Sequence, residues 1–279
     1  MRCFHPTKCK YVVSVGIEVE CGIRDEQSYR QLWDWVNENS EVAERFEAGS
    51  DGSVYVAQCL YRSLELRYWT PVEKWEWMER VLWQMWHRAC IVQNATCGNH
   101  IHLVVRDEYL PLLIYPQFIR YFQRAYLRFS AKQPNPLKYY ERTRGSYSSF
   151  YRGNLEVEVI RQYRGGGSRY KAINYHSLHE WQKTVEFRIM PYADGYNEHL
   201  AQILFVLKTV ESYISTVLRG RRILECSEVS LPTFIPQLRR LWCSLTVPQA
   251  SEVITVEVNA QLPPIVVEVN NPMLGGEVA

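Results

Sequence analysis

The sequence predicts an α+β fold with a largely antiparallel sheet. Helix-like and strand-like segments alternate irregularly along the 279 residues, and several strand-like segments follow one another closely, as in hairpins. The composition includes 47% hydrophobic residues, 19 tyrosines and 9 tryptophans, which suits one large core. We therefore expect a main domain over residues 10–225, a short extension before it (1–9) and a C-terminal helix and acidic tail after it (226–279).

The expected strands are rich in β-branched and aromatic residues and lack a helical period. They cover residues 10–20, 97–105 and 184–192, and residues 54–69 form either two short strands or one bent strand. The expected helices carry an apolar stripe at three- and four-residue spacing and cover residues 25–40, 70–89, 115–130 and 199–218. Thr70 could cap the second of these and Pro71 suits its first turn.

Two regions differ from this pattern, one within the main domain and one in the C-terminal tail. Residues 131–171 are interrupted by glycines, so we expect them to be irregular. Residues 241–279 contain no lysine or arginine, and the tetrapeptide VEVN occurs at 256–259 and again at 267–270. After a short helix near 232–242, this acidic tail could be a flexible arm or two short strands, which could pair with another subunit of a homo-oligomer.

Charge and hydropathy narrow the classes of function. The net charge of +2 gives no reason to expect a nucleic-acid partner. The N-terminus has no apolar signal core, which predicts a cytoplasmic protein with reduced cysteines. The most apolar stretch, residues 200–218, is interrupted by Lys208 and Glu211, so we expect no membrane span.

Three of the expected strands carry polar side chains two residues apart: Glu18 with Glu20, His100 with His102, and Glu186 with Arg188. Residues two apart on a strand share a face and lie about 7 Å from each other. Each pair is flanked by apolar residues, and burying such groups separately would cost several kcal/mol each. If the strands are neighbours, the pairs line one polar surface, and a divalent cation would compensate its carboxylates.

Two more acids fit this surface: Asp51 in the turn SDGS and Glu65 in the segment LELRYWTP. A ligand set made mostly of oxygens favours Mg²⁺ or Mn²⁺ over zinc. Two simpler interpretations stay open. A single glutamate on a strand is usually solvated, and a single His-x-His is more often structural than metal-binding.

Residues 142–171 form a basic, glycine-containing stretch with Arg142, Arg144, Arg152, Arg161, Arg164, Arg169 and Lys171. Arginine forks match phosphate oxygens, so the stretch could close on an anion. It could equally be a solvated basic loop. Tyr147, Phe150 and Tyr151 could stack on RNA bases, but an RNA-binding signature is missing, so we do not expect a nucleic-acid ligand.

The order of these motifs resembles the amidoligase family, which belongs with glutamine synthetase and glutamate–cysteine ligase among the carboxylate–amine ligases. The resemblance runs through GIEVE, DGS, ELRYWTP, CGNHIHL, RYKAINYHS and TVEFR, over roughly residues 10–218. It implies a glutamine-synthetase-like fold, in which a curved antiparallel sheet is backed by helices and holds ATP and divalent metals.

The resemblance also implies residue roles. Glu18 and Glu20 would bind different metal ions, with His100 and Glu186 beside Glu18, and with Glu65 and Asp51 beside Glu20. Asp51 stands where glutamine synthetase has a glutamate, which makes its ligation less secure. His102 would face the nucleotide. Arg188 and Arg169 would contact the transferred phosphate, and the remaining nucleotide contacts would come from Arg164, Lys171 and Asn174.

The implied activity is an ATP- and Mg²⁺-dependent ligase that forms an amide from a small-molecule or peptide carboxylate and an amine. The carboxylate would be activated as an acyl phosphate before the amine attacks. Two other functions stay open on the same residues. One is a metal-dependent hydrolase that uses the histidines and acids without ATP, and the other is a nucleotide-binding or assembly protein without turnover.

Overall fold

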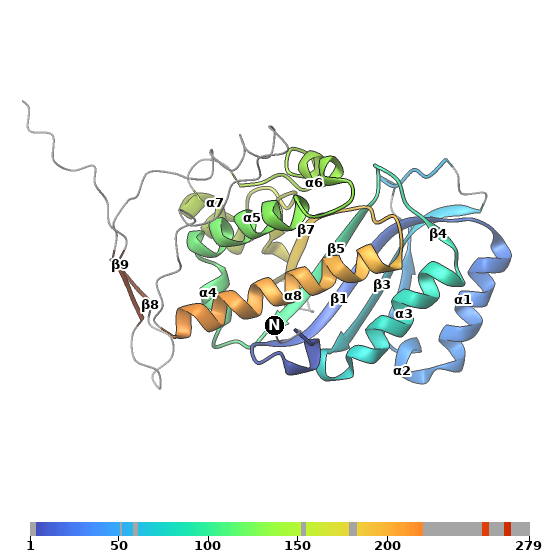
Figure 1. Cartoon of the computed structure of the whole chain (residues 1–279), viewed down its shortest axis with the longest axis horizontal. Coiled ribbons are helices and arrows are strands. Elements are labelled where there is room, and N and C mark those ends of the chain that lie inside the picture. The colour runs from blue at the N-terminus through green and yellow to red at the C-terminus, as the bar shows by residue number, and fades with distance from the viewer. Residues whose placement is uncertain are drawn as a thin grey trace, which may run out of the picture.

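A central antiparallel sheet organises the molecule in the computed structural model (Figure 1). The structure describes residues 4–50, 52–57, 61–151, 155–178 and 183–219, and two short strands of the tail, 253–256 and 265–268. The sheet has seven strands in the order β2-β3-β1-β5-β7-β6, and β4 pairs with β1 beside this path. Every one of these pairs is antiparallel, so the α+β prediction is confirmed.

The long strand β1 (Val12–Ile23) lies near the middle of the sheet. It pairs with β3 (Arg62–Pro71) on one side and with β5 (Gly98–Val105) on the other. The strand β5 in turn pairs with β7 (Val185–Pro191). The short strands are β2 (Phe46–Gly49), β4 (Ile91–Val92) and β6 (Ile173–Asn174). The three strands that carry the polar pairs are therefore neighbours.

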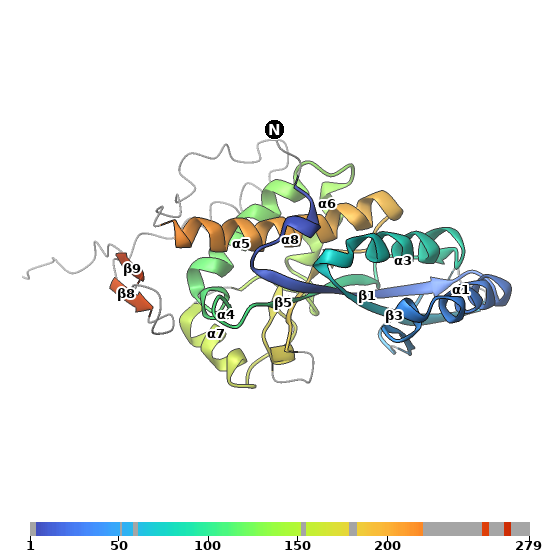
Figure 2. The ribbon, with the colours of Figure 1, turned by 90° about the horizontal axis from the view of Figure 1, so that it is seen from below.

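Helices α3 (Trp75–His87), α5 (Pro116–Ser130) and α8 (Tyr196–Leu218) lie together on one side of the sheet (Figure 2). The other helices are α1 (Glu26–Glu38), α2 (Ser40–Ala43), α4 (Leu110–Leu113), α6 (Pro136–Arg142) and α7 (Leu155–Tyr163). Single turns of 3₁₀-helix occupy Pro6–Lys8, Val72–Lys74 and His176–Leu178.

The strands divide their side chains cleanly between the helix-covered face and the opposite face. On β1, Val15, Ile17 and Val19 are buried in the main core, whereas Gly16, Glu18 and Glu20 alternate with them. The same alternation puts Phe187 of β7 against the rings of Phe118 and Phe122 from α5. Because side chains alternate along a strand, every polar pair lies on the face opposite this core, which we call the open face.

The start of β1 is fixed by a buried carboxylate on α8. Glu211 accepts hydrogen bonds from the backbone N–H groups of Lys10, Tyr11 and Val12 at 3.0, 2.8 and 2.8 Å. Three donors on one carboxylate compensate its burial. In the described part of the chain, α8 is the one helix long and apolar enough to span a membrane by length and composition. Buried core helices meet the same criterion.

Two expectations about local structure were wrong. Thr70 and Pro71 do not begin a helix, because the pairing of β3 with β1 continues to the Ser14–Pro71 pair. Helix α3 starts after them, and its N-cap, Lys74, makes no side-chain capping bond. The region 131–171 is also not irregular throughout, since α6 and α7 lie within it.

The two described tail strands, β8 (Val253–Val256) and β9 (Ile265–Glu268), pair antiparallel with each other. The predicted strands therefore exist, and their partner in the structure is the same chain. The helix expected near 232–242 lies outside the described residues. Four cysteines lie in the described part, Cys9, Cys21, Cys90 and Cys97, and all four are free thiols.

Candidate functional site

Cross-strand pairing brings the predicted polar residues together in three adjacent rows on the open face. Glu18 of β1 lies opposite Arg67 of β3 and opposite His100 of β5. His102 lies opposite Glu186 of β7, which lies opposite Asn174 of β6. Glu20 lies opposite Glu65. Directly opposed residues have Cβ atoms about 5 Å apart, so the side chains of the four central strands form one polar surface.

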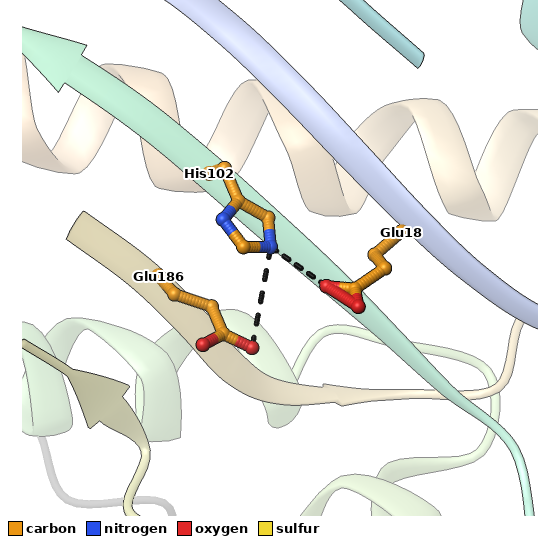
Figure 3. Close-up of side chains that lie close together, drawn as sticks. All are labelled: Glu18, His102 and Glu186. Carbon is orange, nitrogen blue, oxygen red and sulfur yellow. Dashed lines mark hydrogen bonds and ion pairs between the residues drawn. The ribbon is translucent and has the colours of Figure 1, made fainter. Parts of the chain in front are cut away.

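Three of these side chains make the closest group of metal-ligand type among the described residues: Glu18, His102 and Glu186 (Figure 3). The Nε2 atom of His102 lies 2.8 Å from Oε2 of Glu18 and 4.0 Å from Oε1 of Glu186. One ligand atom from each residue lies within 4.8 Å of the others. Such an arrangement could contract around one cation of Mg²⁺ or Mn²⁺ size with little movement.

His100 lies at the centre of the carboxylates and makes no hydrogen bond of its own. It is 2% exposed, and neither ring nitrogen has a hydrogen-bond partner. Its Nδ1 atom is 3.5 Å from a carboxylate oxygen of Glu18 and 3.5 Å from one of Glu186, and its Nε2 atom is 3.5 Å from one of Glu20. A buried polar group without a partner is costly, and a bound cation would supply the missing interaction.

The carboxylates of Glu20 and Glu65 are compensated by a backbone N–H group and by an arginine side chain. Glu20 accepts a hydrogen bond from the backbone N–H of Gly98 at 2.5 Å. Glu65 forms an ion pair with Arg67, whose Nε atom also lies 3.5 Å from Glu18. Burial, followed by the nearby negative charge of Glu18, raises the pKa of Glu65 to about 8. The positive charge of Arg67 opposes this rise in pKa but does not cancel it.

The pKa values of Glu18 and Glu186 shift in the opposite direction, downward. Burial by itself would raise the pKa of Glu18, but interactions with His100 and His102 hold it well below its usual value. Burial opposes ionisation of Glu186 too, yet His102 and Arg188 lower its pKa. For His102, burial lowers the pKa, and the carboxylates of Glu18 and Glu186 raise it more strongly. The carboxylates of Glu18 and Glu186 on one side and the ring of His102 on the other thus each stabilise the charged form of the other.

Two clefts open onto this surface. The first, of about 520 Å³, runs over Glu18, His102 and Glu186 toward β3. The second, of about 390 Å³, lies over Glu20 and Arg142. Arg188 and Arg169 line both clefts. Arg188 forms an ion pair with Glu186, and Arg142 donates to the backbone carbonyl of Arg188 at 3.1 Å. Two guanidinium groups thus stand between the clefts, where an anion would meet them.

Short polar side chains fix the orientation of the central ligands. Asn174 and Ser177 donate to Oε2 of Glu186 at 2.5 and 3.2 Å. Oγ1 of Thr184 lies 3.0 Å from Nδ1 of His102, and Glu18 contacts Nε2. Both ring nitrogens of this histidine therefore have a hydrogen-bond partner. Hydrogen bonds of this kind fix the rotamers of side chains that can bind a metal ion.

The structure brings most, but not all, of the predicted site residues together. Asp51 lies outside the described residues. Lys171 points to Glu158, with 3.6 Å between Nζ and Oε2, and lies outside the lining of both clefts. Arg164, at the end of α7, is exposed and lines neither cleft. Both side chains thus lie outside the two clefts, and their contact with a nucleotide stays a prediction.

Three contributors were not predicted for the site: Arg67, Thr184 and, within the site itself, Arg142. Arg67 had a signal, because it lies two residues after Glu65 and so shares its face. Arg142 belongs to the basic stretch, but only the packing of α6 near β7 places it beside Glu20. Thr184, just before β7, had no distinguishing pattern.

Comparisons with known proteins found no relative. No family model matches the chain, and neither a curated protein nor a solved structure matches it.

Proposed function

We propose that the protein is an ATP- and Mg²⁺-dependent carboxylate–amine ligase of the amidoligase type, with Mn²⁺ as an alternative metal ion, and that its sheet is a member of the glutamine-synthetase-like folds. A substrate carboxylate oxygen attacks the γ-phosphorus of ATP, and ADP leaves. The amine then attacks the acyl phosphate carbon, loses a proton and expels phosphate, which leaves an amide. The substrates are a small-molecule or peptide carboxylate and an amine.

The observation that carries the proposal is the unpartnered imidazole of His100 among three carboxylates from β1 and β7, the two strands that flank β5. Six predicted ligands supply five carboxylates, counting Asp51, and this imidazole, and hard oxygen donors suit Mg²⁺. Glu18, His100, His102 and Glu186 would hold one ion, and Glu20 and Glu65 a second. When bound, the ions supply charge neutralisation for the phosphates.

The arginines support phosphoryl transfer rather than metal binding alone. Arg188 lies beside Glu186 and lines both clefts, as does Arg169. A group in this position can contact a phosphoryl oxygen as it passes from a donor in one cleft to an acceptor in the other. Phosphoryl transfer needs mainly positioning and charge stabilisation, which arginine forks provide without proton transfer.

The test is a ligase assay with hydroxylamine as a general amine and a panel of amino acids and short peptides as carboxylates. We expect hydroxamate and ADP to form in equal amounts, and only when Mg²⁺ or Mn²⁺ is present. Glu186→Gln keeps the shape of the side chain but removes its charge, and should lower turnover on the order of 10²- to 10³-fold. Glu26→Gln, on the exposed first turn of α1, is the matched control and should keep full activity.

Full turnover by Glu186→Gln would refute the site assignment. The compact Glu18–His102–Glu186 group also fits a second candidate, a metal-dependent hydrolase, since one imidazole and two carboxylates can hold a hydrolytic metal ion. That enzyme would cleave ester or amide substrates without ATP. Metal-dependent hydrolysis in the absence of nucleotide, with no hydroxamate in its presence, would favour it over the ligase.

A further inference from the structure

Helix α5 carries three arginines on the face that points away from the core. Each arginine lies two residues after a buried ring, in the pairs Phe118–Arg120, Phe122–Arg124 and Tyr126–Arg128. Two residues turn an α-helix by about 200°, so the arginines lie opposite the rings. Because they are four residues apart, they form one row along the helix, about 12 Å long, which we call the arginine row.

The arginine row is covered, although it lies on the outer side of the helix. The Nε atoms of all three arginines are buried, and so is Oε1 of Gln117, which lies on the same side of α5. This amide oxygen has no hydrogen-bond partner among the described residues. By contrast, the side chain of Arg30, on the outer side of α1, is 73% exposed. The side chains of the row are thus packed against other protein atoms and do not extend into water.

Helices α8 and α6 contact the other side of α5, where the rings lie. The ring of Tyr213 on α8 is centred 5.0 Å from that of Phe118, and the ring of Phe205 is centred 4.4 Å from that of Phe129. Tyr139 of α6 contacts Phe129 at 5.7 Å. These contacts lie on the half of α5 opposite the arginine row, so they do not account for the covering of the row.

The chain that follows α8 starts close to this row. Helices α5 and α8 lie side by side and run in opposite directions, because Phe205 meets Phe129 and the later Tyr213 meets the earlier Phe118 (Figure 1). The end of α8 at Leu218 therefore lies near the start of α5. Seven further residues reach Glu225 and can span up to about 23 Å, which exceeds the length of the row.

Charge and spacing also match. Glu225 and Glu228 are the first acids after α8. Three residues of extended chain span about 10 Å, close to the 12 Å or so between Arg120 and Arg128. Like charges four residues apart on a helix repel each other, and two carboxylates over the row relieve this repulsion. Guanidinium groups bind carboxylates through paired, charge-assisted hydrogen bonds.

We propose that the segment 223–230 docks on the arginine row of its own chain through Glu225 and Glu228. The docking surface lies on the helix-covered side of the sheet, away from both clefts of the open face. It anchors the start of the C-terminal tail to α5, and it does not depend on the ligase function proposed above.

The test exchanges the charges of the two partners and follows hydrogen–deuterium exchange of residues 223–230 by mass spectrometry on the full chain. Four variants are compared with the wild type: Arg124→Glu with Arg128→Glu, Glu225→Arg with Glu228→Arg, all four changes combined, and Glu252→Arg with Glu277→Arg. The last is the matched control, because it reverses two charges of the tail outside the segment. Light scattering after gel filtration gives the oligomeric state of each protein.

In the wild type we expect residues 223–230 to exchange at least about tenfold more slowly than unprotected amides, the factor that corresponds to one charge-assisted hydrogen bond. Either reversal alone should remove this protection. The combined variant should restore it, because the ion pairs form again with their signs exchanged, and the control should match the wild type.

Unprotected exchange in the wild type, or protection that survives reversal of Glu225 and Glu228, would overturn the proposal. Failure of the combined variant to restore protection would overturn it as well, since the two sets of charges would then not meet. A dimer that dissociates whenever protection is lost would assign the segment to the row of a second copy and overturn docking within one chain.

Discussion

Two neighbouring residues of β5, Asn99 and His100, lie on opposite faces of the sheet and show how differently the two faces treat buried polar groups. Asn99 faces the helices and is 0% exposed. It donates to Gln202 at 2.8 Å and to the carbonyl of Pro191 at 3.1 Å, and it accepts from Gln93 at 2.8 Å. His100 faces the open side, is almost as buried, and has no hydrogen bond.

Burial alone therefore does not predict whether a polar side chain of β5 finds its hydrogen-bond partners within the protein. On the helix-covered face, the Asn99–Gln202 contact ties β5 to α8 and is complete without any ligand. On the open face, His100 has no hydrogen-bond partner in the protein. Asn99 should thus matter for folding, and His100 for what the protein binds.

Truncating each residue in turn tests whether Asn99 and His100 differ in their contribution to stability. Asn99→Ala removes a donor or acceptor from three buried groups and should lower the free energy of unfolding by about 2–3 kcal/mol. His100→Ala removes no hydrogen bond, so in metal-free protein its cost should be clearly smaller. Urea unfolding followed by tryptophan fluorescence measures both.

An equal or larger loss for His100→Ala in metal-free protein would contradict this distinction between the faces. Adding Mn²⁺ sharpens the comparison further. The ion should stabilise Asn99→Ala, whose open face is intact, and should leave His100→Ala nearly unchanged.

His199, on α8, is a buried histidine of the helix-covered side whose hydrogen bonding is incomplete. Its Nδ1 atom accepts a hydrogen bond from Trp86 at 3.3 Å, but its Nε2 atom has no partner. Burial lowers the pKa of His199 to about 3. Between pH 7 and pH 5 the unfolded chain, with an ordinary histidine pKa near 6.5, takes up a proton here that the folded protein does not.

Stability should therefore fall as the pH falls over this range, by about 2 kcal/mol from this residue at most. His199→Gln keeps an acceptor for Trp86 but cannot titrate. Its free energy of unfolding should decrease by about 1–2 kcal/mol less than that of the wild type between pH 7 and pH 5. If the two proteins lost equal stability, His199 would be protonated in the folded state as well.

The composition of the open face could be predicted from the sequence because alternation along a strand is local. The spacing of Glu18 and Glu20, of His100 and His102, and of Glu186 and Arg188 was enough to place each pair on one face. That these faces are the same surface depended on strand order. The order follows from long-range pairing of β1 with β3 and β5, which a hydrophobic pattern does not determine.

The sequence pattern did not predict several finer features of the site and of the helices, and each has a physical reason. His102, and not His100, joins Glu18 and Glu186 in the closest group, because side-chain rotamers and the contact with Thr184 decide this. Helices α6 and α7 were missed because they are short and the glycines near them indicated a loop. Arg164 and Lys171 lie outside both clefts, which the basic composition of their stretch does not reveal.

The central claim is that the open face binds a divalent cation through Glu18, His100, His102 and Glu186. Calorimetric titration of metal-free protein with Mn²⁺ tests it most directly, using the wild type, His100→Ala, Glu186→Gln and the exposed control Glu26→Gln. We predict saturable binding by the wild type and the control, and at least about tenfold weaker binding by each of the two site variants. Absence of saturable binding in the wild type, or equal affinity in all four proteins, would contradict the account.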